Sequence, residues 1–229
     1  MRYYPIFLDL RGKRCLVVGA GRVGRRKIAG LLECDPAEVL VLDPGVPSAE
    51  VRSLFEHPAV RHERRAFAAD DAAGRQLAFA ATPERTVNAF VAACCRDRGV
   101  PCNVADAPDQ SDFLVPARVE SGSLTLAVST GGASPALARA LREDLEKWLG
   151  RRYSRLVCLL DKLRPAILAL RLGSDANAEM FRALCALPLR ETLAEALNES
   201  DFGRAEVLLR EILPSVLHPF LAELLHELD

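Results

Sequence analysis

The stretch Arg14–Gly24, RCLVVGAGRVG, decides the fold that we predict for this chain. Its first half is a short apolar run of the kind that forms a buried strand, and its second half places glycines at positions 19, 21 and 24 in the pattern G-x-G-x-x-G. Such a pattern is weak support by itself, but here it follows a predicted strand and opens a predicted helix that runs to about Glu33. We therefore expect a strand, a tight turn and a helix, which together begin a parallel sheet.

The three glycines have separate physical roles in a turn that binds a dinucleotide. Gly19 permits the tight turn, Gly21 lets backbone amides approach a pyrophosphate, and Gly24 lets the helix pack closely on the strand. Arg22 and Val23 complete the turn at the helix N-terminus, where negative charge is favoured, so we count both as candidate cofactor contacts. The alternative interpretation is a glycine turn in an α/β domain that binds nothing.

Asp43 ends the next predicted strand, Glu38–Asp43, and lies nineteen residues after Gly24. A carboxylate here accepts hydrogen bonds from the adenosine ribose. It would repel the 2'-phosphate of NADP by roughly 4 kcal/mol for unit charges about 4 Å apart at an effective dielectric near 20. We therefore expect NAD as the cofactor. The basic run from 22 to 27 leaves two interpretations open, because a reoriented arginine can pair with a 2'-phosphate and a solvated helix face is also basic.

The first hundred residues alternate between short apolar runs and helical patterns, which is typical of a parallel sheet covered by helices. Pro44-Gly45 closes the second strand. Thr82-Pro83 supplies an N-cap and a first-turn proline for a helix that runs through Asp97. The remaining predicted strands of the sheet are Val60–Ala66, Leu77–Ala81 and Cys102–Ala105.

The pattern changes after Pro108. Short strands are predicted at Phe113–Val115, Arg118–Val119 and Ser123–Ser129, with Gly122 in the turn before the last of them. Ser134 is then the expected N-cap of a helix over Pro135–Leu149, and only helical patterns follow. These further predicted helices are Arg152–Leu172, Asn177–Leu187, Leu189–Leu197, Phe202–Leu213 and Ser215–Leu228.

Composition excludes several classes of function. The 30 basic and 31 acidic residues nearly cancel, so no global field directs the chain to nucleic acid or to an anionic membrane. We find no signal-peptide pattern and no apolar run that would span a bilayer, and we expect a cytoplasmic protein. The seven cysteines are scattered without a CxxC pair, and neither they nor the four histidines indicate a metal site.

Six ordered motifs resemble the dehydrogenase and ferrochelatase module of siroheme synthases. The resemblance covers about residues 1 to 150, whereas residues 151 to 229 share only a helical, leucine-rich character. The six motifs are Pro5-Ile6-Phe7-Leu8, the loop from Val18 to Lys27, Ala80-Ala81-Thr82, Val87-Asn88, the run CNVADAP from Cys102 to Pro108, and VSTGGASP from Val128 to Pro135.

This resemblance implies an α/β protein with three parts. A Rossmann-type domain with a parallel sheet would cover residues 1–112, a small α+β dimerisation region residues 113–150, and a helical domain residues 151–229. It also implies NAD-dependent oxidation of precorrin-2 to sirohydrochlorin by a homodimer. Iron insertion into sirohydrochlorin, with ferrous ion as a substrate, stays open as a second activity.

The resemblance further implies roles for individual residues. Asp106 is the candidate catalytic acid or base, and it follows a predicted parallel strand at the edge where such sheets hold ligands. Thr82 and Asn103 are candidate cofactor contacts. The glycine-containing loop of Ser129, Thr130, Gly131 and Gly132 would bind an anionic group of the tetrapyrrole substrate, since turns of this kind form anion-binding concavities. Many relatives have serine where Thr130 stands.

Two other functions compete with this interpretation. An NAD-sensing regulatory module would bind cofactor without chemistry, but it would need neither Asp106 nor the Ser129–Pro135 loop. A dehydrogenase for a small metabolite would need an acid or base near the sheet edge, and no histidine is placed there.

Overall fold

The computed structural model describes residues 2–105 and 107–228. Backbone contacts divide the chain into two compact units, with the boundary between Val115 and Pro116. Each unit is described by itself below.

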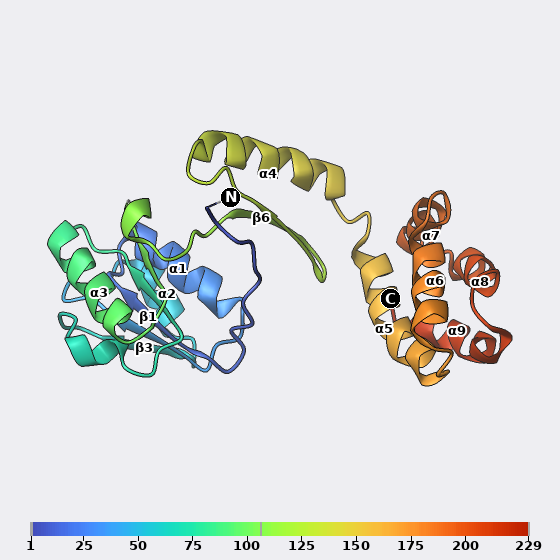
Figure 1. Ribbon diagram of the computed structural model, residues 1–229, viewed down its shortest axis with the longest axis horizontal. Helices are drawn as coiled ribbons and strands as arrows, with labels where there is room; N and C mark the ends of the chain where they lie inside the picture. Colours follow the sequence, from blue (N-terminus) through green and yellow to red (C-terminus); the bar gives the residue numbers. More distant parts are fainter. Residues whose placement is uncertain (1, 106, 229) are drawn as a thin grey trace. The chain divides into compact units, whose positions relative to one another are not determined.

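The first unit is built on a five-stranded parallel sheet with the order β3-β2-β1-β4-β5 (Figure 1). The central strand is β1, which pairs in register with β2 on one side and with β4 on the other. The strands are β1 Arg14–Val18, β2 Glu38–Leu42, β3 Val60–Glu63, β4 Leu77–Ala80 and β5 Cys102–Val104. Because every pairing in this sheet is parallel, the carboxyl ends of the strands lie at one edge, where ligands bind in sheets of this kind.

Alternation along the buried strands produces two apolar cores, one on each face of the sheet. Leu16 and Val18 of β1 face the core that includes Val91 and Cys95. Val17 faces the opposite core, which Ile28 and Leu31 complete with other residues. Because β1 is buried on both faces, it reads in the sequence as a continuous apolar run rather than as an alternating one.

Helices connect the strands and cover the two faces. α1 and α2 lie on one side of the sheet and α3 on the other (Figure 1). No helix was predicted where α2 lies. The connecting elements are α1 Arg22–Leu32, α2 Ala49–Phe55, α3 Arg85–Asp97 and the short 3-10 turns η1 Ala69–Ala72 and η2 Pro108–Gln110.

Two predictions in this unit are wrong. α3 begins at Arg85 with Glu84 as its N-cap. Thr82 is not the cap, because its hydroxyl instead accepts a hydrogen bond from the Glu84 amide in a separate turn. The predicted strand Phe113–Val115 is not a strand. The carbonyl of Phe113 accepts a hydrogen bond from the side chain of Asn103, so a side chain holds this segment where a strand ladder was expected.

The second unit begins with an antiparallel hairpin of β6 Ala117–Ser121 and β7 Leu124–Val128. Gly122 occupies the turn with a φ of +59°. The hairpin is covered by α4 Pro135–Leu149, whose N-terminus is capped by the Ser134 side chain as predicted. The predicted strands Arg118–Val119 and Ser123–Ser129 and this helix are therefore confirmed, with small shifts at the ends.

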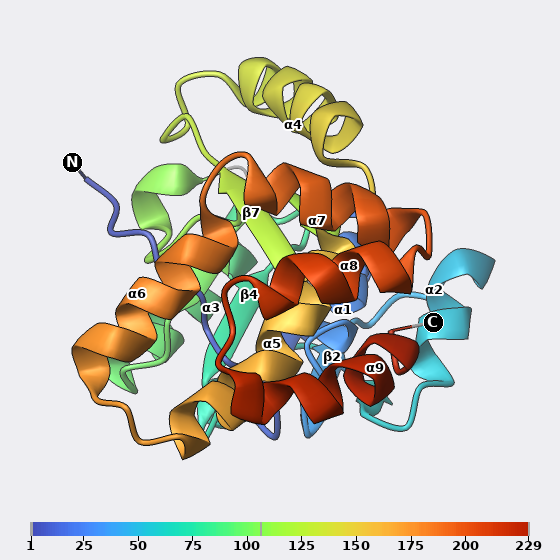
Figure 2. The same ribbon diagram turned by 90° about the vertical axis from the view of Figure 1, so that its right-hand side faces the viewer.

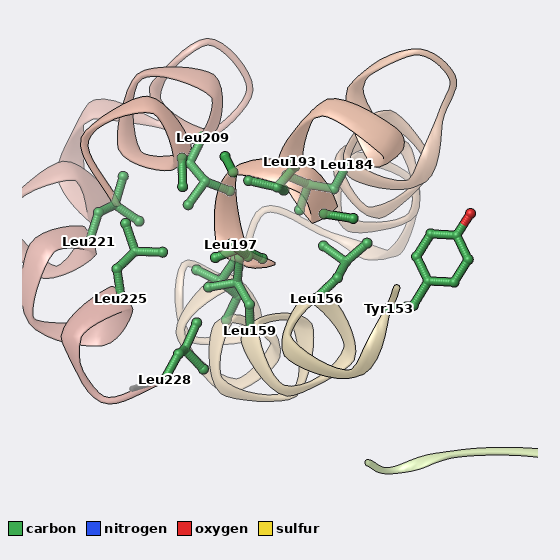
Figure 3. Close-up of a cluster of buried hydrophobic side chains, with 14 of the residues drawn as sticks. Tyr153, Leu156, Leu159, Leu184, Leu193, Leu197, Leu209, Leu221, Leu225 and Leu228 are labelled. Carbon is green, nitrogen blue, oxygen red and sulfur yellow. The ribbon is translucent and has the colours of Figure 1, made fainter. Parts of the chain in front are cut away.

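The rest of the second unit is helical. α7 and α9 pack against α5, and α8 packs between α7 and α9 (Figure 2). Leucines from all these helices point toward one another in a common core, including Leu159, Leu193, Leu209 and Leu221 (Figure 3). The helices are α5 Ser154–Ala169, α6 Ser174–Cys185, α7 Leu189–Asn198, α8 Phe202–Arg210 and α9 His218–His226, the last preceded by the 3-10 turn η3 Ser215–Leu217.

The predicted fold class is confirmed: an α/β chain with a Rossmann-type parallel sheet, followed by a helical C-terminal region. All five helices predicted after Leu149 are present, and their ends differ from the prediction by a few residues. None of the helices that the structure describes combines the length and the apolar character that crossing a membrane requires.

Candidate functional site

The glycine turn after β1 has the geometry that its sequence predicts. Gly19 has a φ of +97°, and a Cβ atom there would lie 2.6 Å from the carbonyl oxygen of Ala81. The amide of Gly19 donates to the carbonyl of Leu42 at 2.8 Å. Both the backbone conformation and the close approach of the chain after β4 therefore require glycine at position 19.

Gly24 and Gly21 meet opposite surroundings. A Cβ on Gly24 would lie 1.9 Å from the carbonyl oxygen of Gly19, so α1 sits directly on the turn. A Cβ on Gly21 would meet no atom within 4 Å, and the space in front of this residue is open. This open space beside the backbone is what a pyrophosphate requires.

The N-terminus of α1 is free to receive an anion. Gly21 is its N-cap, no side chain caps it, and its first turn carries no acidic residue. Arg22 is exposed and Val23 is half-buried at this end of the helix. The first-turn amides and the positive end of the helix dipole therefore face the open space beside Gly21.

Asp43 lies next to the same turn, at the end of β2. Its Oδ2 accepts the amide of Ala20 at 2.6 Å, and its Oδ1 accepts the amide of Gly45 at 2.7 Å. Two backbone amides thus fix the carboxylate beside the glycine turn. A carboxylate has further lone pairs after these bonds, and they remain for the hydroxyls of a ribose.

Thr82 lies at the end of β4, on the other side of the glycine turn from Asp43 in the strand order. Its hydroxyl and its amide both bond to Oδ1 of Asn88, at 2.8 and 3.0 Å, and the Asn88 amide donates to the Thr82 carbonyl at 2.9 Å. Asn88 is 4% exposed. The buried amide therefore holds the loop after β4 in position.

This structural role of Asn88 was not predicted, although the sequence contains a signal for it. Asn88 lies on the same face of α3 as Val91, Ala92 and Cys95, which are buried. A polar residue on an apolar helix face must be hydrogen-bonded, and an amide in that position indicates a loop to be held.

A pocket of about 210 Å³ opens at the carboxyl end of β5, where it meets the first turn of α3. Arg85 and Asn88 line it from the helix, and Ala105 and Ala107 line it from the loop after the strand. The other lining residues are Val104, Pro108, Asp109 and Gln110. Asp106, the predicted catalytic residue, lies outside the residues that the structure describes.

Asn103 is buried in β5, and its amide nitrogen donates to the carbonyl of Phe113 at 2.9 Å. This hydrogen bond gives the amide nitrogen of Asn103 a structural role. The cofactor contact predicted for Asn103 therefore stays a prediction.

The loop Ser129–Gly132 belongs to the second unit. The Ser129 hydroxyl accepts the Gly131 amide at 3.1 Å, and the Thr130 hydroxyl accepts the Ser134 amide at 3.1 Å. Gly131 and Gly132 both have positive φ angles, of +63° and +91°. The loop is thus a compact turn, and the Gly131 amide is already used within it.

The side chain of Lys27 is packed differently from the other basic side chains between residues 22 and 27. Its ammonium lies 5.1 Å from the centre of the Phe79 ring, and burial, together with the charge of Arg26, lowers its pKa. A side chain packed on an aromatic ring is not on the solvated face of the helix. Within the described part of the chain, no group of three or more His, Cys, Asp and Glu side chains could hold a metal ion.

The fold and the glycine turn define a dinucleotide-binding protein of the Rossmann class. Comparison with known families agrees: residues 6–117 match a family described as NAD(P)-binding, and residues 121–147 match the central domain of sirohaem biosynthesis proteins. The chain belongs to the precorrin-2 dehydrogenase and sirohydrochlorin ferrochelatase family, which includes this module of siroheme synthases. The family resemblance expected from the six motifs is confirmed.

Individual relatives support this assignment. The siroheme synthase of Methylococcus capsulatus is 41% identical over 167 residues, which cover 73% of this chain and 35% of that protein. The siroheme synthase of Nitrosococcus oceani is 39% identical over 91% of this chain and 44% of that protein. This chain therefore spans less than half the length of these relatives. A solved structure of SirC, a precorrin-2 dehydrogenase, superposes with a TM-score of 0.74 at 27% identity, over 92% of this chain and 98% of that one.

NAD is the cofactor that this site supports. Gly19, Gly21 and Gly24 would hold its pyrophosphate at the N-terminus of α1, and Asp43 would receive its adenosine ribose. The open space at Gly21 and the fixed carboxylate of Asp43 fit these two parts of the cofactor.

Substitutions of Gly21 and Gly24 by alanine are expected to have different consequences. Gly21→Ala should change the free energy of unfolding by less than about 1 kcal/mol, because its Cβ meets no protein atom, but should weaken NAD binding about tenfold or more by filling the pyrophosphate space. Gly24→Ala should lower stability by about 1–3 kcal/mol, because its Cβ would collide with backbone. Denaturant unfolding and NAD titration calorimetry measure both. Equal stability losses in the two variants would contradict this account.

Asp43 should make NAD bind more tightly than NADP. We expect Asp43→Asn to narrow the difference between the two cofactors, because asparagine keeps an acceptor for the Ala20 amide but removes the charge that repels the 2'-phosphate. Titration calorimetry with both cofactors, on both proteins, measures the ratio of dissociation constants. Equal affinities in the unmodified protein would exclude this role for Asp43.

Proposed function

We propose that this chain oxidises precorrin-2 to sirohydrochlorin with NAD, on the route to siroheme. The observation that carries the proposal is the likeness to the precorrin-2 dehydrogenase SirC over nearly the full length of both chains. The intact glycine turn and the fixed carboxylate of Asp43 add support from this chain's own residues. An NAD-sensing module without catalysis is the alternative, and the assay below separates the two.

In this reaction precorrin-2 loses a hydride, which the nicotinamide accepts, and a proton. The chain's residues have two tasks, to place the cofactor and to receive the proton. The turn at Gly19–Gly24 would fix the pyrophosphate, and the loop at Thr82, held by Asn88, would bound the nicotinamide side of the site. The rigid sheet edge would hold the hydride acceptor at a constant distance from the substrate.

Asp106 is the residue that we propose to take the proton. It lies in the sequence between Ala105 and Ala107, and both of these line the pocket at the carboxyl end of β5. A carboxylate is a suitable general base when it lies within hydrogen-bond reach of the proton that it removes. Ser129, Thr130, Gly131 and Gly132 are proposed to contact a carboxylate of the same substrate.

The dimer is a further part of this proposal. α4 carries three apolar side chains on its outer face: Leu137 is 51% exposed, Leu141 41% and Trp148 52%. Their spacing places them on one stripe of the helix. Because a two-stranded hairpin under one helix has little core of its own, we propose that a second copy covers this stripe, in an isologous contact.

We propose that the region 113–150 is the dimerisation region and that residues 151–229 form a separate helical domain. We also place the protein in the cytoplasm. All seven cysteines, which the structure describes, are free. Burial raises the pKa of the Cys15 thiol to about 11, as in an unreactive core cysteine. Free thiols in this number are typical of a reducing compartment.

We expect Asp106→Ala to bind NAD as the wild type does but to oxidise precorrin-2 about 10²–10⁴ times more slowly, as after loss of an acid or base group. The measurement is sirohydrochlorin absorbance under anaerobic conditions with NAD. Asp97→Ala, which removes a carboxylate from the far end of α3, is the matched control and should be fully active.

A fully active Asp106→Ala variant would remove the proposed role. An inactive wild type that still binds NAD would favour the sensing module. A second assay, with sirohydrochlorin and ferrous ion but without NAD, tests iron insertion, in which the ion is a substrate. If the wild-type protein inserts iron no faster than the uncatalysed reaction, dehydrogenation is its only activity on this route.

The dimer should dissociate when charge is placed on the outer stripe of α4. We expect the wild type to sediment as a dimer and the double variant Leu137→Glu/Leu141→Glu as a monomer, because two buried carboxylates would face the same two in the partner. Val207→Glu, at an exposed apolar position of α8, should leave the dimer intact. A wild type that stays monomeric at every concentration would refute the proposal.

A further inference from the structure

The pocket at the carboxyl end of β5 contains chemistry that the reaction described above does not use. Val104, Ala105, Ala107 and Pro108 form the apolar part of its lining. The polar part of the lining comes from Arg85, Asn88, Asp109 and Gln110. At about 210 Å³ it is smaller than the roughly 300–1,000 Å³ that whole ligands of drug size occupy. It therefore fits one arm of a larger molecule rather than a macrocycle.

The strand order places this pocket on the nicotinamide side of the site. The pyrophosphate turn follows β1, and the ribose carboxylate Asp43 follows β2. β4 and β5 lie on the opposite side of β1 from β2, so the pocket at β5 lies two strands away from the turn, in the direction opposite to the adenosine. A substrate that gives a hydride to the nicotinamide must lie on that side.

Arg85 is available for a ligand. Among the residues that the structure describes, no side chain forms an ion pair or a hydrogen bond with its guanidinium. Asn88, one helical turn further along α3, is occupied with Thr82 and offers the pocket little. Within the described part of the chain, Arg85 thus brings to the pocket a positive charge with which no side chain pairs.

Other charged groups surround this guanidinium. Asp109 lines the same pocket, but its side chain is 95% exposed and lies 3.7 Å from the guanidinium of Arg2. Glu84 precedes Arg85 and is exposed at the helix N-terminus. These carboxylates lie in solvent, where an interaction with an exposed arginine is weak. They therefore do not pair with the Arg85 guanidinium as a ligand carboxylate inside the pocket would.

We propose that this pocket binds one carboxylate arm of the tetrapyrrole substrate. The Arg85 guanidinium would pair with the carboxylate, and the apolar part of the lining would pack on the methylene carbons. The inference rests on the proposed function for the identity of the macrocycle. Arginine presents parallel donors that match a carboxylate, which fixes orientation as well as charge. Arg85 would thereby hold the substrate arm equally well in the ground state and in the transition state.

Binding of uroporphyrin, a macrocycle with acetate and propionate arms that is not a substrate for oxidation, tests the pocket apart from catalysis. We expect Arg85→Gln to raise the dissociation constant about tenfold, as after loss of a charge-assisted hydrogen bond. Arg85→Lys should recover part of the affinity, and Arg96→Gln, which removes an arginine from the other end of α3, should have no effect. The dissociation constant of NAD should be the same in all four proteins.

Coproporphyrin, which lacks the acetate arms, identifies the arm. If Arg85 pairs with a propionate, Arg85→Gln weakens coproporphyrin binding as well, and if it pairs with an acetate, coproporphyrin binding is unchanged while uroporphyrin binding still falls. With precorrin-2, Arg85→Gln should raise KM and leave kcat unchanged, which is the signature of uniform binding.

Three outcomes overturn the inference: no binding of uroporphyrin by the wild type, an equal loss in Arg85→Gln and Arg96→Gln, or a weaker affinity for NAD in Arg85→Gln. The last would assign the pocket to the cofactor. A wild type that binds uroporphyrin through Arg85 but does not oxidise precorrin-2 would support the pocket and refute the proposed function, so the two failures are distinguishable.

Discussion

The contact between Gly24 and the carbonyl of Gly19 is the constraint on which the rest of the first unit depends. It places the backbone of α1 directly against the turn after β1, at a distance that no side chain permits. The helix N-terminus is therefore fixed at the edge of the sheet, beside the open space at Gly21. The anion site follows from packing, because the same contact that fixes the helix also directs its free amides.

The central position of β1 explains why so much of this unit could be predicted. A strand buried on both faces must be apolar throughout, and the loop after it must carry the glycines, so RCLVVGAGRVG states both facts in eleven residues. The same logic identified β2 and β4. Ser134 and Pro135 similarly predicted the start of α4, because capping depends on residues next to one another in the sequence.

What could not be predicted depends on contacts between distant residues. Thr82 reads as a helix cap, yet its hydroxyl accepts the Glu84 amide and donates to Asn88, and α3 begins at Arg85. Phe113 reads as the start of a strand, yet Asn103, ten residues earlier, satisfies its carbonyl. α2 was missed because its seven residues are too few to show a clear period. The pocket at Arg85 could not be predicted either, because an exposed arginine has no distinctive neighbours in the sequence.

Asp43 shows how position and charge combine at the site. Backbone amides from Ala20 and Gly45 each bond one of its two oxygens, so the side chain cannot rotate away when a cofactor approaches. The glycine turn therefore does more than admit a pyrophosphate. Through the Ala20 amide it also holds the negative charge that should distinguish NAD from NADP, and a change in the turn would be expected to alter cofactor choice as well as affinity.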